Sequence, residues 1–451
     1  MKLQSGLEDF EKNPQIWSLI EQISSDECQD EAFYLCNIDE IIEKHRVWTS
    51  ELPKVAPHYA VKCNDDIVIL KVLASLGACF DCASQAEISK VVSIGVTPDR
   101  IVFANPAKPI SHIRYAASVG VSDMTFDSES ELYKIRNVYP HARLIIRIRV
   151  DAVDAQCPLG NKFGCDPIVA APRLLRLAES LNLNVIGISF HVGSGCREPA
   201  VFRRAIKSTR DLYDYSKTLG FDFSVLDIGG GYPGVRGSSI NEIANIVNNS
   251  LDEYFNDVKI RVIAEPGRFY VASAYTLTCN IHSIKNIYEE DDKGNITETH
   301  RMYYIDDGVY GSFNCILYDH QLVKPIPLVE NLEANKISSS IWGPTCDGLD
   351  QVIEEIILPE MNIGECIVFE DMGAYTLPVA SPFNGFPVPK VYYVFTSGAW
   401  SDLKETLALP SNIVKIIEES NIKQNQYNPE RKTSTIFVDS AALKSILVGS
   451  T

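Results

Sequence analysis

A lysine near the start of the chain stands where an amine could react with a carbonyl group. Lys62 follows the apolar segment Tyr59-Ala60-Val61, which is typical of a buried strand. Burial lowers the pKa of an ammonium group, and the neutral amine can then form a Schiff base. A lysine in a strand is otherwise an edge residue whose amine reaches water. Taken alone, Lys62 is compatible with both interpretations.

Two glycine-rich segments come directly after apolar runs and could bind a phosphate. The triplet Gly229-Gly230-Gly231 follows one run, and Gly193 with Ser194 follows another. Backbone N–H groups in such loops can converge on a phosphate, and Arg268, after a third run, adds a cation. One triple glycine could be only a tight turn. Two such loops together with Arg268 favour a phosphate site.

A carboxylate and an imidazole accompany these loops in the sequence. Glu265 ends an apolar run, where a buried carboxylate needs a cationic partner such as a pyridinium nitrogen. His191 could be a hydrogen-bonded core histidine, but its place beside a phosphate loop favours an imidazole stacked on a cofactor ring. A Schiff-base lysine, a carboxylate for a ring nitrogen and a phosphate site together indicate pyridoxal 5′-phosphate (PLP).

These residues share a position relative to the predicted strands. Between residues about 55 and 275, eight apolar or β-branched runs alternate with segments of helical period, which predicts a (β/α)8 barrel that binds PLP. Reacting groups in such a barrel come from the carboxyl ends of the strands, where Asp81 and Arg147 also fall. The predicted strands are 59–63, 79–83, 101–105, 124–127, 144–150, 185–192, 225–229 and 260–265. Glycines predicted as helix C-caps are Gly77, Gly95, Gly120 and Gly220.

After about residue 275 the helical period gives way to alternating strand patterns with Gly and Pro between them, which predicts an all-β domain, barrel- or sandwich-like. We expect the segments 289–298 and 325–338 to be surface loops. The predicted strands of this domain include 276–287, 302–305, 338–342, 365–370 and 391–395.

The chain therefore divides into three predicted parts. Residues 1–37 form an N-terminal segment whose strand-like run, 31–38, is predicted to pair with the β domain. The PLP-binding barrel covers 38–275, and the β domain covers 276–451.

Composition limits the partners. Lys and Arg number 41 against 59 Asp and Glu, so the net charge of −18 disfavours nucleic acid and anionic membranes and suits a cationic substrate. Neither a long apolar run nor a secretory signal is present, so we predict a cytoplasmic protein whose 12 cysteines are reduced thiols. Cys79 and Cys82 form a C-x-x-C with no second pair at metal spacing, so no metal site is predicted.

Seven ordered motifs resemble those of the eukaryotic ornithine decarboxylase family. They are YAVKCN (59–64), SFHVGSG (189–195), LDIGGGYPG (226–234), AEPGR (264–268), DGVYGSFN (307–314), YDH (318–320) and WGPTCDGLD (342–350). The resemblance covers residues about 30 to 400 and places the chain among the PLP-dependent group IV decarboxylases with an alanine-racemase-like fold. It implies the barrel and β domain predicted above, in a homodimer with two active sites at its interface.

The resemblance also implies roles for individual residues. Lys62 would be the PLP aldimine lysine, Glu265 would contact the pyridine nitrogen, and His191 would lie against the ring face. Asp81 and Arg147 would support the site from neighbouring strands. The phosphate would be held by Ser194, Gly230, Gly231, Arg268 and Tyr375. Tyr310 would contact the substrate. Asp319 of one subunit and Asp347 of the other would bind its distal ammonium, and Cys346, also of the other subunit, would protonate the carbanion carbon.

The function implied is decarboxylation of L-ornithine to putrescine and CO2, the first step of polyamine biosynthesis, with antizyme as a further partner.

One alternative is an antizyme-inhibitor-like binding protein without catalysis. Such paralogues resemble the enzyme but have replaced cofactor and substrate residues that this chain retains. The other alternative is a decarboxylase of arginine, diaminopimelate or lysine. Diaminopimelate enzymes are expected to have a Cys-Glu-Ser-type motif where this chain has Cys346-Asp347-Gly348. A lysine decarboxylase is the hardest alternative to distinguish. Lysine is one methylene longer than ornithine, and one methylene changes the free energy of transition-state binding by only about 1–3 kcal/mol.

Two segments depart from the family pattern. The loop 158–164 keeps the family's lysine, Lys162, but not the usual residues before it, and the tail after about residue 400 does not match the vertebrate degradation tail. Regulated degradation through that tail is therefore not implied.

Overall fold

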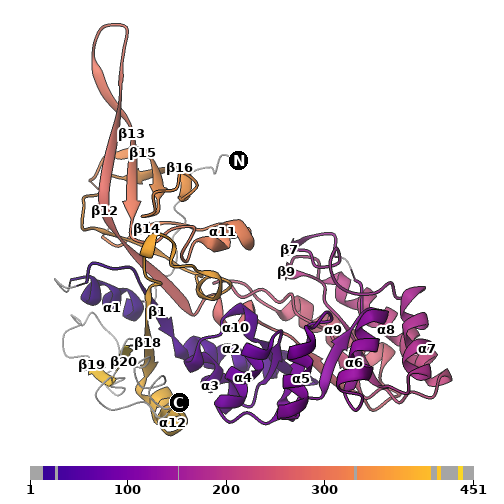
Figure 1. Ribbon diagram of the computed structural model, residues 1–451. Helices are drawn as coiled ribbons and strands as arrows, with labels where there is room; N and C mark the ends of the chain where they lie inside the picture. Colours follow the sequence, from indigo (N-terminus) through magenta and orange to yellow (C-terminus); the bar gives the residue numbers. More distant parts are fainter. Residues whose placement is uncertain are drawn as a thin grey trace. The chain divides into compact units, whose positions relative to one another are not determined.

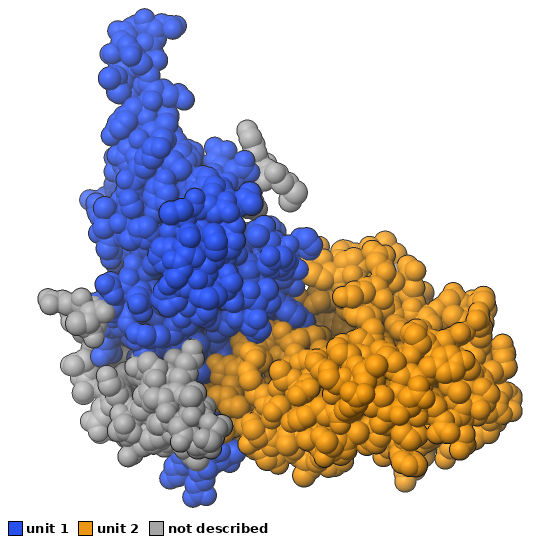
Figure 2. Space-filling view, in the orientation of Figure 1, with its two compact units in different colours: residues 1–40, 273–451 blue, residues 41–272 orange. Residues whose placement is uncertain are grey.

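The computed structural model describes residues 14–25, 29–150, 152–329, 333–407, 414–417 and 435–439 (Figure 1). The chain forms two compact units (Figure 2). One is Ile41–Ala272, and the other combines Met1–Glu40 with Ser273–Thr451. None of the described helices is long and apolar enough to cross a membrane.

Residues 41–272 contain a closed barrel of eight parallel strands, which confirms the predicted (β/α)8 fold. In chain order the strands are β2 (Val55–Ala60), β3 (Cys79–Cys82), β4 (Ile101–Phe103), β5 (Asp123–Phe126), β6 (Arg143–Ile148), β8 (Asn184–Phe190), β10 (Val225–Asp227) and β11 (Arg261–Ala264). Each strand ends before its predicted carboxyl end. The prediction of Lys62 as a strand residue is wrong. Lys62 lies on a 3₁₀ turn, η1 (Val61–Cys63), directly after β2.

The barrel interior is filled by aliphatic side chains from several strands. Val102, Ile145, Val225 and Ile263 belong to one buried cluster. Gly187 on β8 lets the strands approach closely, since a Cβ atom there would lie 2.2 Å from the Val225 carbonyl oxygen. Each fully buried aliphatic side chain contributes about 1.5–3 kcal/mol, so this cluster keeps the strand ends at fixed positions.

Helices follow the barrel strands, as the alternating helical period predicts. They are α3 (Ile67–Ser75), α4 (Gln85–Ser93), α5 (Ile110–Val119), α6 (Glu129–Val138), α7 (Ala170–Ser180), α8 (Ala200–Thr218) and α9 (Asn241–Tyr254), with α2 (Ile38–Glu51) before β2 and α10 (Arg268–Val271) after β11. The side chains of Asp66 and Ser84 cap the N-termini of α3 and α4. The glycines predicted as C-caps, Gly77, Gly95, Gly120 and Gly220, are left-handed with φ between 80° and 90°.

A buried ion cluster joins the start of α5 to α6. The Nζ of Lys108 lies 2.9 Å from Glu131 and also donates to the backbone carbonyls of Asn105 and Thr125. Lys134 pairs with the other oxygen of Glu131. Lys108 and Glu131 are both buried, and burial lowers the pKa of Lys108 to about 8. Within this cluster, each of the two lysines has an oppositely charged partner only while Glu131 is present.

The second unit contains a mixed sheet with the strand order β16-β15-β13-β12-β1-β18-β20-β19, and β17 pairs with both β12 and β14. The strands are β1 (Phe33–Asn37), β12 (Tyr275–Glu290), β13 (Ile296–Ile305), β14 (Ile326–Pro327), β15 (Lys336–Trp342), β16 (Gln351–Pro359), β17 (Cys366–Phe369), β18 (Lys390–Thr396), β19 (Val414–Ile417) and β20 (Thr435–Asp439). β1 is antiparallel to β12 and parallel to β18. The helix α1 (Pro14–Ser24) places Trp17 and Ile20 in one core cluster with Phe33 and Val368.

Parts of this unit differ from the sequence-based expectation. The helices α11 (Asn314–Tyr318) and α12 (Ser397–Leu407) interrupt the strand pattern. The segment 289–298, predicted as a loop, is mostly the end of the β12–β13 hairpin, and only 291–295 turns. Asp291 fixes that turn by accepting the backbone N–H groups of Lys293 and Asn295. The predicted loop 325–338 likewise includes β14 and the start of β15. Exposed strands lack the apolar face that makes a strand visible in sequence.

The ion cluster generates a stability prediction. Replacing Glu131 with Gln removes the carboxylate shared by two lysines and leaves Lys108 buried with an unpaired charge. We expect the free energy of unfolding, measured by urea denaturation, to fall by about 3–5 kcal/mol. The matched control is Glu129→Gln on the same helix, because Glu129 and its partner Arg173 are both exposed. The control should change stability by less than about 1 kcal/mol. Equal effects of the two substitutions would contradict a special role for the buried cluster.

Candidate active site

An amine and a buried carboxylate meet where β2 and β3 end. Lys62 follows β2, Asp81 lies on β3, and the Lys62 Nζ forms an ion pair with Asp81 Oδ2. The Asp81 side chain is fully buried, whereas that of Lys62 is 37% exposed. The Lys62 amine is therefore partly exposed and lies beside a buried carboxylate. The other oxygen of Asp81 is buried without a hydrogen-bond partner.

Two more carboxylates are buried at the ends of the neighbouring strands β10 and β11. Glu265 follows β11, and burial, reinforced by Asp227 and Asp81, raises its pKa well above the usual range. Asp227 ends β10, where burial raises its pKa to about 6. Sequence reasoning missed Asp227, although an aspartate inside the apolar run before the triple glycine is itself a signal. These carboxylates suit a cationic ring nitrogen, which would balance their charge.

His191 lies within the same cluster as a neutral imidazole. Its Nδ1 accepts the backbone N–H of Gly193 at 3.0 Å. Burial, followed by the charges of Arg147 and Lys62, lowers its pKa well below the usual range. A Cβ atom on Gly230 would come within 2.8 Å of His191 Nε2 and of the Glu265 carbonyl oxygen, so only glycine fits between them.

Four of the five expected phosphate residues, Ser194, Gly230, Gly231 and Arg268, lie in the unit Ile41–Ala272, and Tyr375 belongs to the other unit. Arg268, the first residue of α10, donates from Nε (3.1 Å) and Nη2 (2.7 Å) to the Oγ of Ser194, the first residue of β9 (Ser194–Cys196). Gly193, Gly229 and Gly231 are left-handed, with φ of 106°, 64° and 113°. The strand β9 pairs with β7 (Ala155–Cys157), and this pairing holds the loop of Gly193 and Ser194 in place. The glycine loops and the cation fit a phosphate group.

Arg147 occupies the strand position predicted for it. It lies buried on β6, opposite Ser189 of β8. Its guanidinium stands 5.3 Å from the ring centroid of Phe163, in the loop that departs from the family pattern. This contact links the loop 158–164 to the barrel.

The expected substrate residues form a second group, in the unit that contains residues 273–451. The Tyr310 hydroxyl donates to Asp347 Oδ2, and the Leu349 N–H donates to Asp347 Oδ1. These bonds lower the pKa of Asp347, whereas the bond to Asp347 raises the pKa of Tyr310. Asp347 is thus an ionised carboxylate at neutral pH. Cys346 beside it is exposed.

Two other expected residues of this unit are placed separately. Asp319 is buried directly after α11, where its N–H donates to the Cys315 carbonyl. Tyr375 has a left-handed backbone with φ of 55°. The role of Tyr375 at the phosphate stays a prediction.

A buried carboxylate that sequence reasoning did not assign ties the two loops of this group together. Asp350 Oδ1 accepts the Val309 N–H, and Asp350 Oδ2 accepts both the N–H and the hydroxyl of Thr345. Gly308 and Gly343 pack against it so closely that a Cβ atom at either would lie 2.2 Å from Asp350 Oδ1. Asp350 therefore fixes the loops that carry Tyr310 and Asp347.

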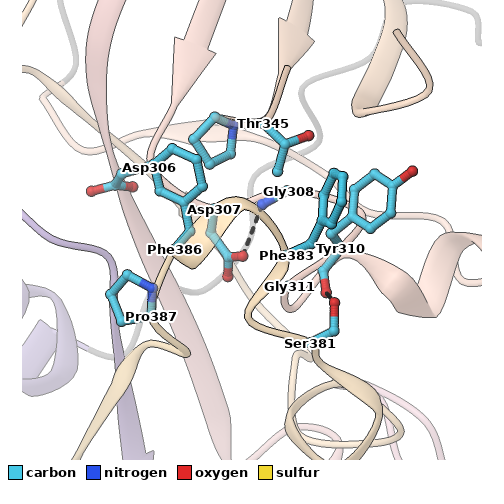
Figure 3. Close-up of a pocket in the computed structure, with 11 residues that line it drawn as sticks. Asp306, Asp307, Gly308, Tyr310, Gly311, Thr345, Ser381, Phe383, Phe386 and Pro387 are labelled. Atoms are coloured by element: carbon cyan, nitrogen blue, oxygen red, sulfur yellow. Dashed lines mark hydrogen bonds between the residues drawn. The ribbon is translucent and has the colours of Figure 1, made fainter. Parts of the chain in front are cut away.

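A small pocket adjoins these loops (Figure 3). Its lining combines carboxylates and aromatic rings, namely Asp306, Asp307, Tyr310, Phe383 and Phe386, with Gly308, Gly311, Pro344, Thr345, Ser381 and Pro387. Burial raises the pKa of Asp306 to about 7 and that of Asp307 to about 6. The rings of Tyr310 and Phe383 face each other with centroids 4.5 Å apart.

Comparison with known proteins identifies the family. Residues 38–272 match the family model of the pyridoxal-dependent decarboxylase, pyridoxal binding domain. The chain is 48% identical to ornithine decarboxylase of Rattus norvegicus over 86% of its own length and 85% of that protein. It is 43% identical to antizyme inhibitor 2 of Xenopus laevis, over 90% and 89%. Among solved structures, arginine decarboxylase of Paramecium bursaria Chlorella virus bound to agmatine is 35% identical, with a TM-score of 0.78 over 84% of this chain and 100% of that one. The chain therefore belongs to the pyridoxal-dependent decarboxylase family, whose cofactor is PLP.

Proposed function

We propose that this chain decarboxylates L-ornithine to putrescine and CO2, the first step of polyamine biosynthesis. The observation that carries the proposal is the ionised carboxylate of Asp347, held by Tyr310 on an exposed loop beside Cys346. Such a carboxylate attracts a substrate with a distal ammonium and disfavours one with a neutral or acidic side chain. The similarity to ornithine decarboxylase of the rat supports ornithine as that substrate.

In the proposed mechanism PLP supplies an electron sink that stabilises the charge left when CO2 departs. Lys62 would hold the cofactor through its aldehyde, and Asp81 would orient the lysine through their ion pair. Glu265, next to Asp227, would stabilise the protonated ring nitrogen, because a carboxylate favours a cation beside it. Ser194 and Arg268, with the loop of Gly230 and Gly231, bind the phosphate.

The remaining steps depend on the other residues of the two groups. His191 is neutral and therefore suited to lie against the ring face without adding charge. Arg147 supports the site from β6. Asp319 and Asp347 bind the distal ammonium, and Cys346 returns a proton to the substrate carbon.

We further propose a homodimer in which Tyr310, Cys346 and Asp347 act in the partner's active site. Two exposed apolar side chains contact or adjoin these residues: Leu349, whose N–H binds Asp347, is 74% exposed, and Phe383, whose ring lies against that of Tyr310, is 42% exposed. Large exposed apolar groups beside functional residues are typical of an interface, and a second copy would cover them.

The second candidate function is that of a binding protein related to antizyme inhibitors. The similarity to antizyme inhibitor 2 favours it and also suggests antizyme as a partner. Lys62 and Arg268 are present with the contacts described above, and Cys346 is present and exposed, which favours the enzyme. Lysine remains the alternative substrate. We propose a cytoplasmic location, in keeping with the function.

The first prediction from the proposed function concerns the cofactor lysine. Borohydride reduction followed by peptide mapping should place a pyridoxyl group on Lys62, because its side chain is partly exposed and directly follows β2 at the end of the barrel that holds the glycine loops. Lys108 is the informative comparison, since its pKa is lowered to about 8 but its amine is enclosed by Glu131 and two carbonyls. A pyridoxyl group on Lys108, or on no lysine, would contradict the assignment.

The second prediction tests the shared site. Lys62→Ala and Cys346→Ala proteins should each be inactive in CO2 release from ornithine. Mixing them should restore part of the activity, because a mixed dimer contains one site with neither lesion. If native mass spectrometry shows mixed dimers and activity stays at the level of the separate variants, the residues do not come from different subunits.

The third prediction concerns substrate choice. Asp347→Asn keeps the size and removes the charge, and a hydrogen bond to a charged group contributes about 1.5–3 kcal/mol. We expect kcat/KM for ornithine to fall roughly 10- to 150-fold while PLP remains bound. Asp291→Asn is the control, because Asp291 is also an exposed carboxylate of lowered pKa but lies at the hairpin tip. An unchanged kcat/KM in Asp347→Asn would remove the main physical support for a diamino acid.

A further inference from the structure

An Asn-Gly turn lies against the loops that carry Cys346 and Tyr310. Asn384 and Gly385 both have left-handed backbones, with φ of 53° and 82°. The Phe386 N–H donates to the Phe383 carbonyl at 3.3 Å, which closes the turn around them. Two consecutive positive φ values define a type I′ turn, and Asn-Gly is the pair that adopts it most readily. The local sequence therefore fixes this turn.

The turn and the residues just before it contact both loops. Asn384 Oδ1 accepts the backbone N–H of Cys346 at 3.0 Å. The Ser381 N–H donates to the Tyr310 carbonyl at 2.9 Å, and the Ser381 hydroxyl donates to the same oxygen (Figure 3). Phe383 stacks on the Tyr310 ring. Residues 381–385 therefore form a clamp on the two loops.

We propose that Asn384 is a positioning residue that sets the place of the Cys346 thiol. The inference rests on the proposed function, because it assumes that Cys346 transfers a proton to the substrate. Asn384 acts only through Cys346 and need not touch the substrate itself.

The neighbouring contacts show what Asn384 adds. Thr345, before the cysteine, is held by Asp350, and Asp347, after it, is held by Tyr310. Asn384 binds the peptide of Cys346 itself. Proton transfer requires the donor within about 2.6–3.2 Å of its target, and small errors of placement cost large factors in rate. An exposed cysteine thus depends on its backbone contact for a defined position.

Two substitutions separate the hydrogen bond from the turn. Asn384→Gly keeps the left-handed turn, because glycine adopts positive φ freely, and removes the acceptor. Asn384→Asp keeps both the turn and the acceptor oxygen. With ornithine as substrate we expect Asn384→Gly to lower kcat roughly 3- to 10-fold with little change in KM, PLP content or melting temperature. Asn384→Asp should retain kcat within about twofold of the wild type.

Subunit mixing adds an independent readout. Asn384 and Cys346 lie in the same unit, so the two substitutions should behave alike in mixed dimers. Mixing Asn384→Gly with Lys62→Ala should therefore restore part of the CO2-releasing activity, as mixing Cys346→Ala with Lys62→Ala should. Mixing Asn384→Gly with Cys346→Ala should restore none beyond the residual activity of Asn384→Gly. A purely structural defect would lower the melting temperature and would not follow this pattern.

The outcomes distinguish this inference from the proposed function. If the wild type releases CO2 from ornithine and Cys346→Ala is inactive, but Asn384→Gly matches the wild type, the Asn384 inference is wrong. Equal losses in Asn384→Gly and Asn384→Asp would also overturn it, because the acceptor would then be irrelevant. If the wild type releases no CO2 from ornithine, or Cys346→Ala keeps full activity, the proposed function itself fails.

Discussion

Three carboxylates buried at the carboxyl ends of barrel strands set the main constraint on this protein. Asp81, Asp227 and Glu265 are each less than a tenth exposed. Lys62 and Arg147 are the cations whose charges act on Glu265, yet the pKa of Glu265 stays well above the usual range. Burying negative charge without full compensation costs several kcal/mol, and a cofactor with a cationic ring nitrogen would supply positive charge at this position.

The same end of the barrel is shaped by the absence of side chains. A Cβ atom on Gly229 would come within 2.2 Å of the Phe190 carbonyl oxygen, and one on Gly234 within 2.0 Å of the Arg268 carbonyl oxygen. Close packing of backbone on backbone brings Ser194 and Arg268 into hydrogen-bonding contact, although 74 residues separate them in the chain. Charge compensation and steric exclusion therefore favour the same ligand, a phosphorylated cationic ring.

The sheet-containing unit uses a different principle, because its functional candidates are on loops and not at strand ends. Asp350, Ser381 and Asn384 hold these loops by hydrogen bonds to backbone groups. Loops held in this way present Cys346 and Asp347 outward while keeping their positions defined. This arrangement suits residues that act on a ligand bound by another copy of the chain.

Sequence alone determined the barrel, because alternating apolar runs and helical periods with capping glycines are local signals. It also identified Lys62, Glu265, Ser194 and Arg268 as residues at strand ends, although their roles stay proposals. It could not find the exposed strands of the β12–β13 hairpin or the helix α12, since these lack a distinct apolar pattern. Tertiary structure alone decided that Lys62 leaves its strand to meet Asp81, that Asp227 joins Glu265, and that Asn384 reaches Cys346. Each of these is a contact between segments distant in the chain, and such contacts depend on how the backbone folds in space and not on the residues adjacent in sequence.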